Sequence, residues 1–72
     1  MGEVSSQDVQ PWAQTALANS PIHELRHLRV EQRNGALLIC GVVSSFYHKQ
    51  LAQEVVRAVC REIELINSVD VR

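Results

Sequence analysis

The sequence predicts an α+β domain, an αββαβ two-layer sandwich in which two helices pack on one face of a three-stranded mixed β-sheet. Three observations predict this fold. The pair Asn34-Gly35 separates two runs of alternating apolar residues, which is typical of a β-hairpin. One stretch before the hairpin and one after it repeat apolar residues with helical spacing. The final residues, "LINSVDVR", alternate again and indicate a third strand.

The first helix is expected to begin at Asp8, which is a favourable N-cap residue. Pro11 then falls in the first turn, where its missing N–H has no intrahelical role. The helix is expected to end at Asn19-Ser20-Pro21, because the residue before a proline is disfavoured in the helical region. Residues 22–26 are expected to form a turn or a short helical piece.

The hairpin register follows from a type I′ turn at Asn34-Gly35, where both residues must tolerate a positive φ angle. In this register Arg33 faces Ala36 and Leu28 faces Gly41. A glycine on the inner face is expected to let a helix approach closely. The predicted inner face consists of Leu28, Val30, Leu37, Ile39, Gly41 and Val43.

The second helix is expected over residues 46–63, with Ser44 or Ser45 as its N-cap. A helical crossover brings the last strand back parallel to the second, so the sheet is mixed. The apolar stripe predicted for this helix consists of Leu51, Ala52, Val55, Val56, Val59 and Ile63, and the last strand is expected to point Leu65, Val69 and Val71 inward.

Seventy-two residues make one small domain, predicted as residues 8–72 after a flexible lead-in of residues 1–7. A formal net charge of -1 argues against a nucleic-acid partner. No apolar run approaches the roughly 20 residues of a transmembrane helix, and the first residues do not form a secretory signal. A cytoplasmic location is expected for a complete chain, and a periplasmic or envelope location for a domain of a longer exported protein.

The sequence resembles a BON domain, a small family named from bacterial osmotic-shock and nodulation proteins. The resemblance is carried by "ALANSPI", by "LRVEQRNGALLICGVVSS", by the spacing from Ser45 through Lys49 to Val59, and by "LINSVDV". Its most specific positions are Asn34, Gly35, Gly41 and Asn67. One departure is "CREIEL", which lacks the glycine that the family usually places between the second helix and the last strand.

The resemblance implies the same two-layer sandwich and no catalytic residue or cofactor. It also implies a binding module for phospholipid or for envelope components. The residues themselves indicate a second apolar face of the sheet, flanked by arginines that suit lipid phosphates. The alternative is a protein-interaction or homo-oligomerisation surface, and ordinary surface apolarity is a third interpretation. The candidate contact residues are Arg29, Arg33, Leu38, Cys40, Val42 and Ile66.

Other chemistry has little support in the sequence. The three histidines are expected at one end of the molecule and exposed to solvent, but no fourth ligand has diagnostic spacing, so no metal site is predicted. Cys40 and Cys60 are expected on opposite sides of the sheet, too far apart for a disulfide. No nucleophile and base are expected to meet, so the chain is not expected to be an enzyme.

Overall fold

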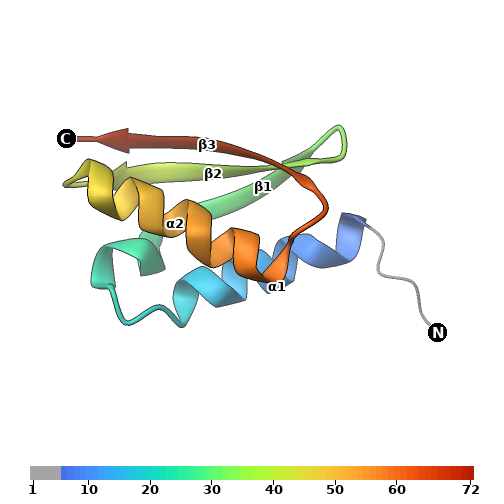
Figure 1. The fold of residues 1–72 in the computed structure, drawn as a ribbon, viewed down its shortest axis with the longest axis horizontal. Helices are drawn as coiled ribbons and strands as arrows, with labels where there is room; N and C mark the ends of the chain where they lie inside the picture. Colours follow the sequence, from blue (N-terminus) through green and yellow to red (C-terminus); the bar gives the residue numbers. More distant parts are fainter. Residues whose placement is uncertain (1–5) are drawn as a thin grey trace.

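The computed structural model describes residues 6–72 and has the predicted α+β fold (Figure 1). Helix α1 (Ser6–Ala18) leads through a short 3₁₀ helix, η1 (His23–His27), into strand β1 (Arg29–Arg33). Strand β2 (Ala36–Val43), helix α2 (Phe46–Val59) and strand β3 (Glu64–Val71) follow. No helix of this part of the chain is long and apolar enough to cross a membrane.

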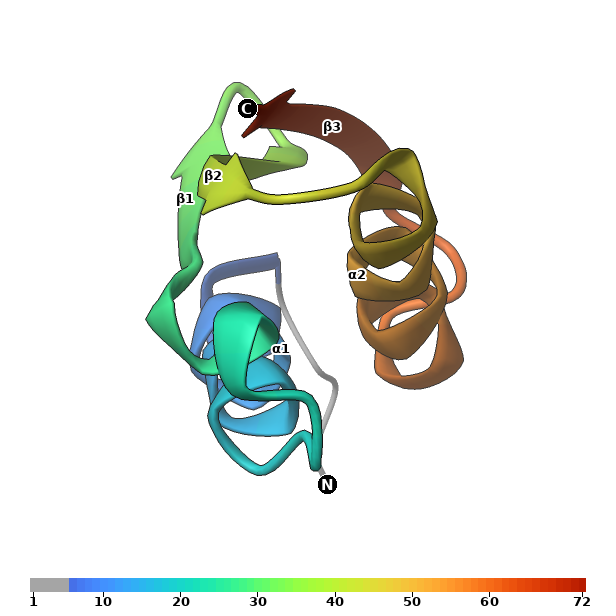
Figure 2. The same ribbon diagram turned by 90° about the vertical axis from the view of Figure 1, so that its left-hand side faces the viewer.

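The sheet has the order β1-β2-β3, with β1 antiparallel and β3 parallel to the central strand. The predicted hairpin register is confirmed, since Arg33 pairs with Ala36 and Val30 with Ile39. The turn has φ angles of 52° at Asn34 and 82° at Gly35, as a type I′ turn requires. Figure 2 shows α1 beneath β1 and α2 beneath β3, so both helices cover the same face of the sheet.

The core lies between this inner face and the two helices. Its buried members come from every element, including η1, which contributes Leu25. The predicted alternation of the strands is confirmed, and the only large difference on α2 is Val59, which is 44% exposed at the last residue of the helix. The largest buried side chains are Leu17, Leu25, Leu28, Leu37, Ile39, Val43, Val56 and Val69.

The predicted end of the first helix and the predicted start of the second are confirmed, whereas the start of the first and the end of the second need correction. α1 begins at Ser6, so Asp8 is not its N-cap and Pro11 lies inside the helix beyond the first turn. An acidic residue is favourable both as an N-cap and in the first turn, so its presence does not fix the helix start. The predicted lead-in therefore overlaps α1 at residues 6 and 7, and residues 1–5 lie outside the described residues.

At the other helix, α2 ends at Val59, four residues earlier than predicted. The reason is tertiary: β3 pairs with β2 from Ala36 and Glu64 onward, so the chain must leave the helix early enough to reach that position. Ser45 is the N-cap of α2, and its hydroxyl accepts the backbone N–H of His48 at 3.1 Å.

The explanation predicted for Gly41 is wrong, although its place in the register is right. A Cβ atom built at Gly41 would lie 2.6 Å from Cδ2 of Leu28, so the close approach comes from the residue just before β1 and not from α1 or α2. Gly41 also has a φ angle of 139°, which side-chain-bearing residues rarely adopt.

Candidate functional site

The candidate site is the outer face of the sheet, which we define as the side chains of β1, β2 and β3 that point away from both helices. The strand register arranges them in rows across the sheet. One row consists of Glu31, Leu38 and Ile66, and the next of Arg29, Cys40 and Ser68. The rows at the two ends are Arg33, Ala36 and Glu64, and Val42 with Asp70. The sequence thus placed all six candidate contact residues on one face.

The apolar members of the outer face lie mostly on the central strand. Leu38 and Cys40 are half-buried, whereas Val42 is 49% and Ile66 is 40% exposed. Leu38 and Ile66 are direct partners in the register, so they form one continuous apolar patch. Val42 lies four residues along the same strand, on the same face.

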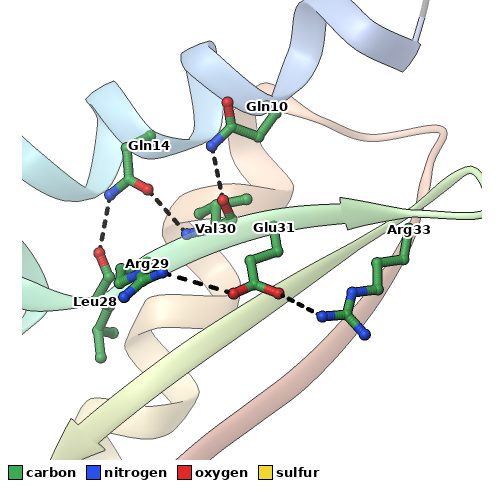
Figure 3. A network of polar contacts seen from close by, with 7 residues as sticks. All are labelled: Gln10, Gln14, Leu28, Arg29, Val30, Glu31 and Arg33. Atoms are coloured by element: carbon green, nitrogen blue, oxygen red, sulfur yellow. Dashed lines mark hydrogen bonds and ion pairs between the residues drawn. The ribbon is translucent and has the colours of Figure 1, made fainter.

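The arginines of this face are less available to an anion than the sequence indicated. Glu31 lies between them on β1 and accepts contacts from both, at 3.2 Å from Arg33 and 3.9 Å from Arg29 (Figure 3). Arg72, which follows β3, similarly lies 3.9 Å from Asp70. Pairs this exposed contribute little to stability, but they neutralise the local field. The signal that the sequence reasoning overlooked was the spacing Arg29, Glu31, Arg33, which puts three charges on one side of a strand.

Counting every ionised side chain on or beside the outer face gives no net charge. Arg29, Arg33 and Arg72 are positive, and Glu31, Glu64 and Asp70 are negative. A face with this balance has no average attraction to an anionic membrane. It can, however, meet another balanced face without net repulsion.

Figure 3 also shows how α1 covers the free edge of β1. Gln14 donates its amide to the carbonyl of Leu28 at 2.8 Å and accepts the backbone N–H of Val30 at 2.9 Å. Gln10 donates to the carbonyl of Val30 at 2.7 Å. Three of the backbone groups that another strand would need are therefore already bonded. The helical spacing of Gln10 and Gln14 was visible in the sequence, but their contact with β1 was not.

On the other edge, Asn67 has a structural role. Its Oδ1 accepts the backbone N–H of Val69 at 3.2 Å, and its Nδ2 donates to the carbonyl of Lys49 at 2.9 Å. The same Nδ2 lies 3.3 Å from Oε1 of Gln53. Asn67 thereby fastens β3 to α2 and occupies part of the β3 edge. Edge-to-edge strand addition is therefore hindered on both sides of the sheet.

A second polar cluster lies where η1 meets the start of α2. Oε1 of Glu24 lies 2.7 Å from Nδ1 of His48 and accepts the backbone N–H of Ser44 at 3.0 Å. Hydrogen bonds from Ser44 first, and then from His48, lower the pKa of Glu24 from 4.5 to about 2. His48 is thus a half-buried partner of a carboxylate, which corrects the prediction that all three histidines are solvated. His23 and His27 are exposed as predicted.

The two cysteines are free, as predicted. Cys40 pairs with Arg29 in the register and belongs to the outer face. Cys60 follows the last residue of α2 and is buried, with its Sγ 3.7 Å from the carbonyl of Val9. Burial raises the pKa of the Cys60 thiol, which keeps it protonated and unreactive at neutral pH.

The sequence reasoning did not single out two exposed aromatic residues. Phe46 and Tyr47 open α2 and are 75% and 67% exposed, although Phe46 is the only phenylalanine of the chain. They follow the N-cap Ser45 directly and lie outside the outer face. Their exposure places both side chains outside the core.

No protein-family model matches the chain, and no curated protein matches its sequence. The resemblance to BON domains therefore stays a prediction from the sequence.

Proposed function

We propose that this chain is a non-catalytic interaction domain that associates with a second copy of itself through the outer face of the sheet. The observation that carries the proposal is an apolar patch within a charge-balanced face. Leu38, Val42 and Ile66 supply apolar area, and the flanking ionised side chains sum to zero. Of the two functions that the resemblance to BON domains and the residues suggested, this balance favours protein association over binding to anionic phospholipid.

A second copy of the chain is the partner best matched to an outer face whose charges sum to zero. In a two-fold symmetric pair each residue of the face meets a residue of the same face, so a balanced face is complementary in total charge to itself. Two sheets packed face to face also bury the apolar patches against each other, as in a β-sandwich. The edges are poorer candidates, because Gln10, Gln14 and Asn67 already bond backbone groups there.

The size of the face limits the strength of such a pair. β2 has eight residues, so the face is roughly 26 Å long, and three strands give it a width of about 15 Å. Each copy would bury about 400 Å², which is half of the ~800 Å² that a standard interface buries on each partner. We therefore expect a weak, concentration-dependent dimer.

The test is sedimentation equilibrium from about 10 µM to about 1 mM, a range that brackets weak association. The double variant Leu38→Glu/Val42→Glu places charges in the patch and should remain monomeric at every concentration. Phe46→Ser is the matched control, since it removes a more exposed apolar side chain outside the face and should leave association intact. A wild-type chain that is monomeric throughout, or a dimer that tolerates the double variant, would refute the proposal.

Vesicle flotation separates the phospholipid alternative. Under our proposal the protein binds neither anionic nor zwitterionic vesicles at physiological ionic strength, because the outer face has no net charge. Binding to anionic vesicles that Arg29→Gln/Arg33→Gln abolishes would replace the proposal with the membrane function.

A further inference from the structure

The short helix η1 carries an exposed histidine at each end, and the two imidazole rings meet. Nε2 of His23 lies 3.2 Å from Nε2 of His27. The ring centroids are 4.8 Å apart and the planes are inclined by 71°. The sequence offers no fourth ligand with diagnostic spacing, so no metal site was predicted here, but η1 brings these two rings into contact.

We propose that His23 and His27 form a chelating site for a divalent transition-metal cation of the Zn²⁺, Ni²⁺ and Cu²⁺ group. Imidazole nitrogens bind such ions at about 2.0–2.1 Å. Two nitrogens at that distance from one ion, with an angle of about 100° at the metal, lie about 3.2 Å apart. The observed separation therefore already equals the distance between two ligands of one cation. Bringing them onto the ion needs only small side-chain rotations.

The proton balance of binding is simple. In the neutral pair, one imidazole can donate its Nε2–H to the Nε2 of the other ring, which lies at hydrogen-bonding distance. A cation that takes both Nε2 atoms requires both rings to carry their proton on Nδ1. Binding therefore converts the donor ring to its other neutral tautomer and releases no net proton from the pair.

The middle of η1 is anchored, so the chelating geometry is held in advance. Leu25 is fully buried in the core, and Glu24 is bonded to Ser44 and His48. Arg26 donates its Nε–H to the carbonyl of Ser20 at 2.8 Å, so the guanidinium group of Arg26 is directed toward the end of α1. Binding then costs little conformational entropy, because the backbone between the two ligands is already ordered.

The ligand set selects the class of cation. Two imidazoles suit Zn²⁺, Ni²⁺ and Cu²⁺, whereas Ca²⁺ and Mg²⁺ require oxygen ligands. Within the described residues, no third histidine, cysteine or acidic residue joins the pair. Water would fill the remaining positions, so the site has modest affinity and, by the general order of divalent metals, binds Cu²⁺ most tightly.

The experiment is a Zn²⁺ titration of the untagged, ¹⁵N-labelled chain, followed through its imidazole NMR signals. Zn²⁺ is diamagnetic, so each ring can be observed at every step. We expect the signals of His23 and His27 to shift together and to saturate at one ion per chain. His48 is an internal control within the same protein, because its Nδ1 is held by Glu24 and its signals should stay in place.

His23→Gln and His27→Gln should each raise the Zn²⁺ concentration for half-saturation by at least about tenfold, since the second ligand of a chelate binds intramolecularly. Both positions are exposed, so these variants should fold normally. Ca²⁺ should cause no shifts. The proposal is wrong if His48 responds in parallel with the other two rings, if no ring responds, or if either glutamine variant binds Zn²⁺ as the wild type does.

Discussion

Gly35 and Gly41 both adopt positive φ angles, but only one of them is also constrained by a neighbour. Gly35 lies in the hairpin turn and has open space where a Cβ would stand. Gly41 lies within β2, and a Cβ there would collide with Leu28, which is itself buried in the core. Replacing Gly35 by alanine therefore introduces backbone strain alone, whereas replacing Gly41 introduces both backbone strain and overpacking.

We predict that Gly41→Ala lowers the free energy of unfolding by about 3 kcal/mol, because a rare φ angle and displacement of Leu28 act together. Gly35→Ala should cost about 1 kcal/mol, since only the backbone angle is unfavourable. Urea denaturation followed by circular dichroism measures both. Equal losses for the two variants would contradict the role assigned to Leu28.

Among the elements, α1 does more than cover the core. Gln10 and Gln14 project from it onto β1 and satisfy backbone groups that a sheet edge normally leaves free. Asn67 acts similarly at β3, where it also holds α2. Amide side chains suit this task because each carries both a donor and an acceptor. The small sheet is thus partly protected at both edges.

We predict that Gln14→Ala lowers the free energy of unfolding by about 1–3 kcal/mol, because it removes two hydrogen bonds and leaves the N–H of Val30 without its partner. Hydrogen exchange at the Val30 amide should become faster than in the wild type. Gln50→Ala is the control, since Gln50 is exposed on α2 and its amide donates to the exposed side chain of Glu54, so a change within about 0.5 kcal/mol is expected. Unchanged exchange at Val30 would show that the edge is protected in another way.

For the whole molecule, the cluster around Glu24 connects parts of the chain that are distant in sequence. It joins η1 to the β2–α2 connection and to the first turn of α2. η1 in turn contributes Leu25 to the core, so the cluster links the surface to the packing of the domain. A chain of 72 residues has a small free energy of unfolding, so losing the contacts of Glu24 should destabilise the whole fold.

The stability of the domain should therefore depend on pH through Glu24. Its pKa in the folded state is about 2 and lies below the unfolded value of 4.5, so the ionised carboxylate stabilises the fold at and above pH 4.5. This contribution is lost as the pH falls from 4.5 toward 2. We predict that Glu24→Gln is less stable than the wild type at pH 7, and that the two proteins converge near pH 2.

Urea midpoints at several pH values between 7 and 2 test this prediction. Glu54→Gln is the control, because Glu54 is exposed on α2 and should not change the pH profile relative to the wild type. A constant difference between the wild type and Glu24→Gln over the whole range would mean that the carboxylate acts through its shape and not through its charge.

The sequence by itself determined the order of the elements, the hairpin register and the two faces of the sheet. These features depend on local chemistry: the turn residues Asn34 and Gly35, and an alternation of apolar residues with period two. Because the alternation assigns every side chain to one face, the six candidate contact residues were also assigned to the same face of the sheet. The start of α1 and the end of α2 did not follow, because Asp8 suits two positions and the end of α2 depends on where β3 must pair.

Only the tertiary structure decided which polar groups meet. Glu24 and His48 are 24 residues apart in sequence, and Gln14 reaches Val30 across 16 residues. Such pairs leave no periodic trace, because each depends on how one element is rotated against another. Other contacts join residues that are close in sequence, such as Glu31 with its two arginines and His23 with His27. These contacts still depend on the conformations of β1 and η1. Pattern thus fixes which face a residue occupies, whereas packing fixes its partner.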